Sequence, residues 1–458
     1  MTKSILHRDP RKVKFAAVAT FLFVLLPVLR AQNRSLSLQD CIDIALGKSA
    51  RLEAGHFDLL AATAEIYAAR ASLWPDLTGT VTGEEFSGRP TSKFGVVVTG
   101  VTPTGSGVTS GKEVGSAFVA IFGADLKYPL FENGSILGLN DAPTVERARA
   151  QQKALEWTNH LTREEVIFRV THSFIATVSA QNRVEPVDRR VELLERSLAI
   201  TKEQQGKGLI IPADVAVINE QLDGARALAK VIHEQAAAGS LELTRLLGLP
   251  SSTHIRLVNT LPSPPVPPSA GLLLSSALAQ HPQLFVQRAK IERAKQDWRL
   301  ERFRQYPSLI LHGSAVDVND FENDASEYIG AVTMHIPIWD FGAQRATVLA
   351  RKDTFAAEQV RLASVGDDIA NDIVNIYEQV YALSERMLTL QAEIGKLDKD
   401  FRVAQSQEQQ GITPPLTTID IEVQLVGKRD ELAVDEAHRL ELYANLQRAT
   451  GGTWKWLR

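Results

Sequence analysis

The most regular hydrophobic pattern in the chain is a row of apolar residues in its last third. Over residues 373–404 the apolar positions are separated by three and four residues in strict alternation. A repeat of 3.5 residues places these side chains along one face of a helix that supercoils with its neighbours. Residues 184–198 carry a shorter row of the same kind. The pattern predicts two long helices, at about 139–205 and 343–410, packed as coiled coils.

Two other stretches alternate apolar and polar residues instead. Between Pro75 and Pro129, and again between Pro307 and Pro337, apolar side chains occupy every second position of segments about ten residues long. Each stretch predicts a pair of strands with one apolar and one polar face, as in a membrane β-barrel or a half-buried soluble sheet. The aromatic residues expected where these strands meet the helices, at a membrane interface, are Trp74, Tyr128, Phe131, Tyr306 and Trp339.

The helical and strand patterns occur twice in the same order. The segment from Ala45 to Pro75 recurs 232 residues later. The segment that ends the second strand of the first pair recurs 208 residues later, at the end of the second pair. Features of the long helices match at an offset of 203. Such recurrence indicates an internal duplication. We expect a signal peptide at 1–31, a first repeat at 32–261 with strands at about 76–128, a proline-rich linker at 262–268, and a second repeat at 269–458 with strands at about 308–336.

Glycine and proline interrupt both long helices at corresponding places. Gly208 and Pro212 in the first repeat match Gly411 and Pro415 in the second. Glycine suits the end of one helix and proline the start of the next, so each segment predicts a hairpin with a tip. Apolar residues exposed at such tips favour contact with a partner protein. The expected docking residues are Gly208, Ile210, Ile211, Pro212, Asp214, Gly411, Pro414 and Pro415.

The first 31 residues combine a basic head with an apolar run at residues 15–29. This is typical of a secretory signal, although an N-terminal anchor helix would share the pattern. Without these residues the chain has 44 Lys and Arg against 53 Asp and Glu, a net charge of −9. That acidic balance lacks the basic face that nucleic-acid binding requires, so we expect no nucleic-acid partner.

The rest of the chain contains no stretch of about 18–20 apolar residues that would predict a transmembrane helix. A membrane location would therefore require a β-barrel. Four strands cannot close a barrel alone, and open strand edges are not tolerated in lipid. The chain is therefore expected to oligomerise, and a trimer would supply twelve strands.

Motifs for catalysis or cofactor binding are lacking. Residues 104–112 resemble a phosphate loop but have the wrong spacing, and the ten histidines show no metal-ligand spacing. His312 and His335 could face each other across a strand pair, although lumen residues fit better than a metal site. Cys41, the single cysteine, excludes an intrachain disulfide, and it fits a buried helix position better than a lipidation site. We expect no enzyme activity, no metal and no cofactor.

In these features the chain resembles the TolC-type outer-membrane efflux family over nearly all of its mature length. The shared motifs are the Ala-Leu opening of each repeat, the aromatic-Pro entry to each first strand, the Pro-Leu-Phe and Pro-Ile-Trp-Asp-Phe-Gly exits, and the glycine-containing tips. The resemblance implies a mainly α fold with a membrane β-barrel. It implies a homotrimer with twelve strands, surrounded by lipid in the outer membrane of a Gram-negative-type cell. A long α-barrel would extend into the periplasm.

The resemblance further implies a passive exit duct for small molecules or proteins. Such a duct serves a tripartite efflux or type I secretion system, together with a periplasmic adaptor and an inner-membrane pump of the RND or ABC type. The alternative is a periplasmic coiled-coil scaffold or adaptor with a small soluble β-domain. The two strand pairs bounded by aromatic residues favour the duct.

Family members carry acidic rings and a latching basic residue near the second tip. Aligned from Gly411, the acidic positions fall on Thr417 and Asp420, and the basic position falls on Thr413. Only Asp420 keeps the family chemistry, so the resemblance implies an aperture at Asp420, Thr417 and Thr413 with an altered latch. Asp214 at the first tip is a candidate substitute.

Overall fold

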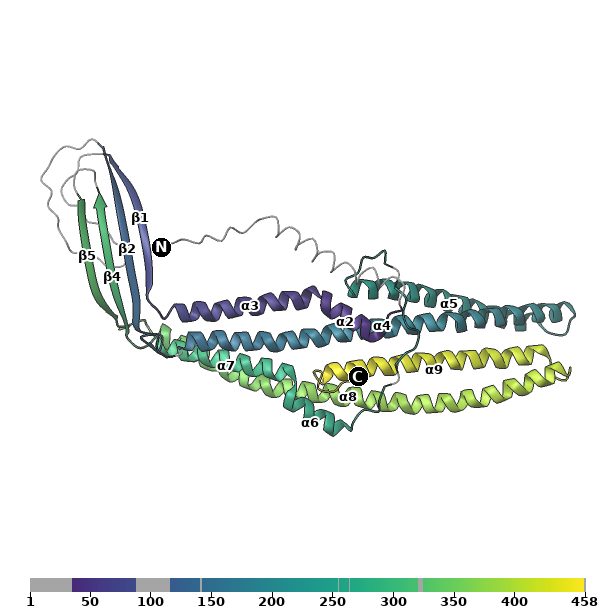
Figure 1. Cartoon of the computed structure of the whole chain (residues 1–458). Helices are drawn as coiled ribbons and strands as arrows, with labels where there is room; N and C mark the ends of the chain where they lie inside the picture. Colours follow the sequence, from purple (N-terminus) through teal and green to yellow (C-terminus); the bar gives the residue numbers. More distant parts are fainter. Residues whose placement is uncertain are drawn as a thin grey trace, which may run out of the picture. The chain divides into compact units, whose positions relative to one another are not determined.

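The structure is a computed structural model that describes residues 35–87, 116–140, 142–253, 255–262, 264–319 and 324–456 (Figure 1). The expected signal peptide lies outside these residues, as does the phosphate-loop-like segment. No described helix is both long and apolar enough to cross a lipid bilayer. The helices are α2 (Leu38–Lys48), α3 (Ala50–Ala71), α4 (Pro143–Gly206), α5 (Pro212–Leu246), α6 (Ala270–Gln280), α7 (Pro282–Phe303), α8 (Ala343–Gln409) and α9 (Pro415–Ala449). The strands are β1 (Asp76–Ser87), β2 (Ser116–Glu132), β3 (Ser135–Ile136), β4 (Ser308–Asn319) and β5 (Asp324–His335).

The order of the elements confirms the internal duplication. The series α2-α3-β1-β2-α4-α5 is followed by α6-α7-β4-β5-α8-α9, and the short β3, which pairs with β2, is an unpredicted addition. Gly208 and Gly411, which follow α4 and α8, have φ angles of 74° and 71°. Glycine adopts this left-handed conformation without the steric cost that a Cβ imposes. The two long helices therefore end in the same way, at positions 203 residues apart.

The four longer strands form an antiparallel sheet in the order β1-β2-β4-β5. The registers place Val81 opposite Phe122 and Ala124 opposite Ala315. Among the described strands, β1 pairs only with β2, and β5 pairs only with β4. Both outer strands therefore present an open edge, as predicted for a sheet of four strands.

The two faces of the sheet differ in polarity. Cross-strand pairing places Leu77, Val81 and Phe122 on one face, and all three side chains are exposed. Tyr328, Val332 and Met334 of β5 lie on the same face by register and are exposed as well. The opposite face carries Thr78, Thr80, Asp125, Lys127, His312, Thr333 and His335.

His312 and His335 do not face each other. His312 lies opposite Ala331, whereas His335 lies opposite Ser308, four positions away along β4. The suggested pairing of the two histidines across the strands is therefore absent.

The chain forms two compact units, and each unit combines parts of both repeats. The first contains the described parts of residues 35–57, 157–285 and 363–456, and the second those of 58–156 and 286–362. The helices α4 and α8 each contribute to both units. The compact units therefore do not coincide with the repeats, because each repeat packs against the other.

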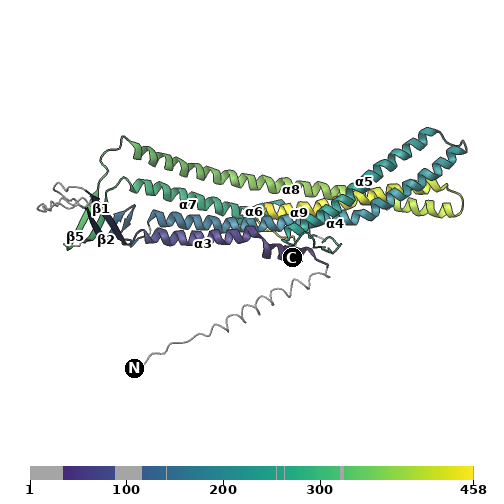
Figure 2. The same ribbon diagram turned by 90° about the horizontal axis from the view of Figure 1, so that it is seen from above.

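In the first unit, two antiparallel hairpins, α4–α5 and α8–α9, are joined through α4 and α9 (Figure 1; Figure 2 shows the same helices from above). The resulting order of helices is α5-α4-α9-α8, which leaves α5 and α8 at the edges. The pairs that connect successive helices include His233–Asp188 at 3.0 Å, Arg183–Asp430 at 2.6 Å and Lys428–Glu393 at 3.2 Å.

The second unit contains a comparable row of helices beside the sheet. Its order is α3-α4-α7-α8, with α3 and α8 at the edges. The connecting contacts include Gln152–Thr63 at 2.8 Å, Arg147–Asp297 at 3.5 Å and Gln287–Glu358 at 2.7 Å.

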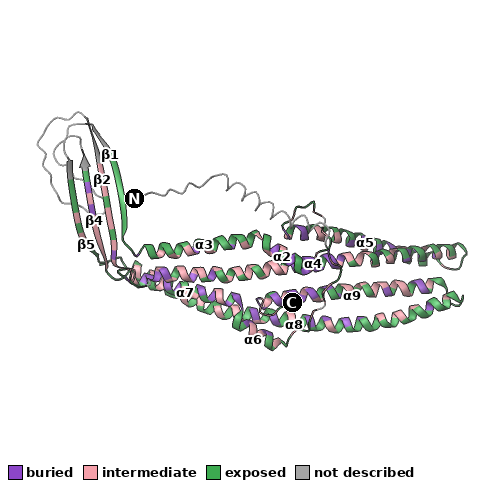
Figure 3. Cartoon of the chain, in the orientation of Figure 1, coloured by how far each residue is buried: buried purple, intermediate pink, exposed green. Residues whose placement is uncertain are grey.

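The apolar row of α8 forms a packed seam, which confirms the coiled-coil prediction. All ten predicted positions are buried or half-buried, while the residues between them are mostly exposed (Figure 3). Burial of such a row is the main source of stability in packed helices of this kind. The fully or nearly fully buried members are Ile373, Val380, Leu383, Met387, Leu390 and Ala404.

Candidate functional site: hairpin tips and open edges

The first tip joins α4 to α5 and carries exposed apolar side chains. After Gly208, the backbone N–H of Leu209 donates to the carbonyl of Gln204 at 3.0 Å, which closes the helix end. Leu209 and Ile211 are exposed, whereas Ile210 is half-buried. The apolar surface predicted at this tip is therefore present, but Leu209 contributes to it more than Ile210 does.

Asp214 has a structural role at the same tip. Its carboxylate accepts a hydrogen bond from the N–H of Ile211 at 3.3 Å, just before Pro212 begins α5. An acidic side chain in the first turn satisfies an otherwise unpaired N–H group and opposes the positive end of the helix dipole. This hydrogen bond uses one carboxylate oxygen of Asp214. The structure therefore gives Asp214 a role as a helix cap.

The second tip, between α8 and α9, has the same construction. The N–H of Ile412 donates to the carbonyl of Gln407 at 2.9 Å, and the hydroxyl of Thr413 donates to the side chain of Gln407 at 2.8 Å. Ile412 is exposed, and Pro414 and Pro415 lead into α9. Thr413, the position at which the resemblance implied a basic residue, uses its side chain to close the turn.

Thr417 and Asp420 lie on one exposed face at the start of α9. Thr418 and Ile419 between them point into the packed side of the helix and are buried. Partial burial raises the pKa of Asp420 above the ordinary carboxyl value. The three predicted aperture positions therefore cluster at one end of hairpin α8–α9, and Asp420 is the acidic group among them.

Two arginines of α4 form ion pairs with carboxylates of α9. The sequence predicted neither pair. Arg183 binds Asp430 through two hydrogen bonds of 2.6 and 2.9 Å, with side-chain exposures of 17% and 14%. Arg189 binds Glu422 at 2.8 Å. The Arg183–Asp430 pair is bidentate, which makes it strong and geometrically specific, whereas both contacts of Arg189 go to one oxygen of Glu422. Both pairs connect the two hairpins, and no local pattern marks them because the partners are more than 230 residues apart.

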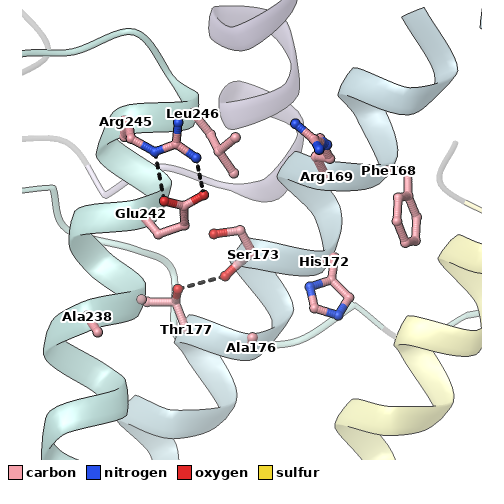
Figure 4. Close-up of a pocket in the computed structure, with 11 residues that line it drawn as sticks. Phe168, Arg169, His172, Ser173, Ala176, Thr177, Ala238, Glu242, Arg245 and Leu246 are labelled. Carbon is pink, nitrogen blue, oxygen red and sulfur yellow. Dashed lines mark hydrogen bonds and ion pairs between the residues drawn. The ribbon is translucent and has the colours of Figure 1, made fainter. Parts of the chain in front are cut away.

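A pocket between α4 and α5 lies in the first unit (Figure 4). On one wall, the guanidinium of Arg245 donates to Glu242 at 2.8 and 2.6 Å. The two helices approach closely because Gly239 lacks a side chain, since a Cβ there would lie 2.6 Å from the hydroxyl oxygen of Thr177. One wall of the pocket therefore carries Arg245 of α5, which is an edge helix of this row.

Within the described residues, no group of three His, Cys, Asp or Glu side chains is arranged to hold a metal ion. Cys41 is completely buried, and burial raises its pKa to about 12. A thiol with so high a pKa is a poor nucleophile at neutral pH. Cys41 is therefore a core residue, as its helix position indicated.

The edge helices carry additional apolar rows that face away from the packed seams. On α8, Val360, Val374, Tyr381 and Leu388 are spaced by multiples of seven residues and are exposed. On α3, Phe57, Leu60 and Tyr67 are likewise exposed. Contiguous exposed apolar rows mark contact surfaces. The exposed rows on α3 and α8 therefore resemble seams that no other described helix of the chain covers.

Comparisons with known proteins agree with this architecture. Residues 273–452 match the family described as outer membrane efflux protein. The chain is 21% identical to the probable efflux pump outer membrane protein TtgC of Pseudomonas putida, over 91% of this chain and 83% of TtgC. It is 20% identical to the pyoverdine export outer membrane protein OpmQ of Pseudomonas aeruginosa, over 66% of this chain and 65% of OpmQ, just under two thirds of that relative. The solved structure of the outer membrane protein VceC of Vibrio cholerae has the same fold, with a TM-score of 0.71 and 16% identity over 91% of this chain and 96% of VceC.

Proposed function

We propose that this chain is a TolC-type outer-membrane efflux protein and serves as the exit duct of a tripartite efflux or type I secretion system, a proposal supported by its similarity to outer membrane efflux proteins in sequence and fold. In this proposal the strands lie in the outer membrane and the helix hairpins in the periplasm. Transport through the duct is passive, because energy for export is supplied by an inner-membrane pump of the RND or ABC type. The cargo is a small molecule or a protein.

The observation that carries the proposal is the sheet with one exposed apolar face and two open edges. Leu77, Val81 and Tyr328 are exposed on the apolar face. Lipid would cover that face, whereas water would not favour it. The edge strands β1 and β5 leave backbone groups that must be paired inside a membrane. The alternative, a soluble scaffold, would leave both features without a purpose.

Closure by three copies satisfies the open edges. The β5 edge of one copy would pair with the β1 edge of the next, and three copies would form a closed barrel of twelve strands. The helical rows would close in the same head-to-tail sense, because each has two different edges. The exposed row of Val374, Tyr381 and Leu388 on α8 supports this arrangement, since a neighbouring helix would complete a second seam there.

We propose that the tips bind a periplasmic adaptor that links the duct to its pump. Leu209, Ile211 and Ile412 give each hairpin an exposed apolar end. The remaining tip residues, Gly208, Ile210, Pro212, Asp214, Gly411, Pro414 and Pro415, shape and support these ends.

The same proposal places the periplasmic aperture at Asp420, with Thr417 and Thr413 beside it. Three copies of an exposed carboxylate around a threefold axis would form an acidic ring. Such a ring concentrates cations at the narrow end of the duct and repels anions.

Single-channel recording tests the proposed function without knowledge of the cargo. Purified protein added to planar lipid bilayers should produce discrete, cation-preferring conductance steps. A preparation denatured and refolded without lipid is the control for detergent leakage. A correctly folded preparation that never conducts would contradict the duct and favour the soluble scaffold.

A further inference from the structure

The duplication extends to individual ion pairs in the two hairpins of the first unit. Arg226 of α5 binds Glu195 of α4 at 2.7 Å, and Arg429 of α9 binds Asp398 of α8 at 3.0 Å. Each member of the second pair lies 203 residues after its counterpart in the first. One offset therefore relates the two hairpins side chain by side chain, and a contact in one predicts the position of a contact in the other.

The internal joint between the hairpins includes a small polar cluster. Arg448 of α9 lies 3.7 Å from the carboxylate of Glu165 on α4, and its guanidinium also stands 4.5 Å from the ring centre of Phe168. The neighbouring Gln447 donates to Glu164 at 3.2 Å. These contacts join the C-terminal end of α9 to α4 and hold one hairpin beside the other.

The counterparts of this cluster lie at the two outer edges of the row. Subtracting the offset of 203 takes Arg448 to Arg245 on α5, and adding it takes Glu164 and Glu165 to Asp367 and Asp368 on α8. The basic residue therefore corresponds to a basic residue, and the two acidic residues correspond to two acidic residues. Because α4 and α9 separate α5 from α8 within the chain, these groups can meet only between two copies.

Burial follows the same correspondence. Val178 and Ala444 are buried in the core of the first unit, with exposures of 0% and 4%. Their counterparts are Tyr381 on α8 and Leu241 on α5, whose exposures are 62% and 59%. Val178 and Ala444 are thus buried where α4 meets α9, whereas the apolar residues at the equivalent positions of α8 and α5 are exposed. This is the pattern expected if the edges of two copies form the same joint.

We infer that Asp368 of one copy forms an ion pair with Arg245 of the next, with Asp367 beside it, in the register of the internal Glu165–Arg448 joint. The inference rests on the proposed ring of copies. It adds which helices meet, α8 with α5, and at which level along them. Apolar contact between the rows that contain Tyr381 and Leu241 supplies the hydrophobic part of the interface.

The geometry of Arg245 permits a second partner. Its guanidinium already binds Glu242 on its own helix, on the wall of the pocket in Figure 4. Arg448 does the equivalent, since it donates to Asn445 at 3.3 Å while it contacts Glu165. A guanidinium carries five N–H groups, so one side chain can serve both partners. The side chain of Arg245 is 70% exposed and is free to reach a neighbouring copy.

Chemical cross-linking of the full chain in outer membranes tests the register. The variant carries Arg245→Cys and Asp368→Cys together with Cys41→Ala, so that no other thiol can react. A short bismaleimide should convert it to covalent dimers and trimers on denaturing gels. The matched control replaces Asp368→Cys by Asp400→Cys, another exposed aspartate of α8 about 48 Å farther along the helix at 1.5 Å per residue. It should give at least a tenfold lower yield.

The outcomes separate this inference from the proposed function. The native mass of each cysteine variant is measured before cross-linking. Trimers that cross-link through Arg245→Cys and Asp368→Cys, but not through the control pair, support the register. Trimers in which both pairs cross-link equally, or neither does, overturn the register and leave the duct intact. A monomeric wild-type protein would overturn the ring itself.

A charge exchange provides an independent readout. Arg245→Glu and Asp368→Arg should each lower the temperature at which the trimer dissociates in detergent, because each places like charges together. The double variant should recover most of that loss, since the pair is restored with its signs exchanged. Losses that simply add in the double variant would overturn the inference.

Discussion

Single residues at the tips have structural roles that bear on the proposed aperture. The hydroxyl of Thr413, where the resemblance led us to expect the altered latch, closes its own turn through Gln407. Asp214, the candidate substitute, accepts the capping hydrogen bond at the start of α5. Asp420 alone keeps an acidic side chain on an exposed face near the tip. The arginine pairs Arg183–Asp430 and Arg189–Glu422 hold the hairpins together farther from the tips.

Asp420→Asn tests the aperture. Removing three charges from a ring should reduce cation preference in single-channel recordings and abolish block by divalent cations from the periplasmic side. Because burial raises the pKa of Asp420, cation preference of the wild type should also fade at a higher pH than an ordinary carboxyl would give.

The control for this experiment is Asp223→Asn, an exposed carboxylate of α5 away from the tip. Its conductance should match that of the wild type. Unchanged cation preference and unchanged block in Asp420→Asn would show that Asp420 does not line the constriction.

His281 predicts a loss of stability in acid. It is buried at the α6–α7 junction, and burial lowers its pKa below the ordinary value. At pH values below about 6.5 the unfolded chain binds a proton that the folded chain excludes, so the free energy of unfolding falls as the pH falls. The effect is absent well above that pH, where both states are neutral.

The measurement is the thermal midpoint of the helical circular-dichroism signal at pH 7.5 and 5.5. His281→Gln should show a smaller decrease between the two conditions than the wild type, because it has no proton to bind at this position. An equal decrease in both proteins would mean that the acid sensitivity arises elsewhere.

The elements of the fold follow from sequence patterns wherever the pattern is local. The seam of α8, the glycine ends at Gly208 and Gly411 and the alternation in the strands each depend on residues close together in the chain. The duplication could be predicted for the same reason, since each half carries the same local signals. Cross-repeat contacts such as Arg183–Asp430 depend on how α4 and α9 align in space, and no periodicity fixes that alignment.

The sequence did not predict which apolar side chains are exposed at the first tip. Ile210 and Ile211 are adjacent and equally apolar, yet Ile210 is half-buried while Ile211 is exposed, with Leu209 exposed beside it. The turn around Gly208 decides which side chains point outward, and its dihedral angles cannot be read from hydrophobicity.

A tip variant tests hairpin docking at the level of the element. Leu209→Asp combined with Ile211→Asp places two charges where the adaptor surface is expected. The variant should abolish export of a compound that a strain lacking this protein fails to remove, because charges resist burial in an apolar contact. Trimer assembly should be unaffected, since both side chains lie in the turn between α4 and α5, outside the edge rows of α3 and α8 and the sheet edges that are proposed to join the copies.

Val266→Asp is the matched control, because Val266 is an exposed apolar residue in the proline-rich linker outside the tips. Export by this variant should equal that of the wild type. Full export by the tip variant would show that docking occurs at another surface.

At the level of the molecule, the sheet and both rows of helices end in open edges within the described residues. Its sheet ends in the open strands β1 and β5, and its helical rows end in α3, α5 and α8. The exposed apolar rows on α3 and α8 lie on these edge helices, where a neighbouring copy would cover them. Head-to-tail closure of a few copies removes every open edge at once, and it leaves a central passage between them.

Native mass spectrometry of protein extracted from the outer membrane in detergent tests this account most directly. The account predicts one dominant species of three mature chains, because four strands from each of three copies close a barrel of twelve. A stable, folded monomer under the same conditions would contradict it, since two open strand edges would then persist in the membrane.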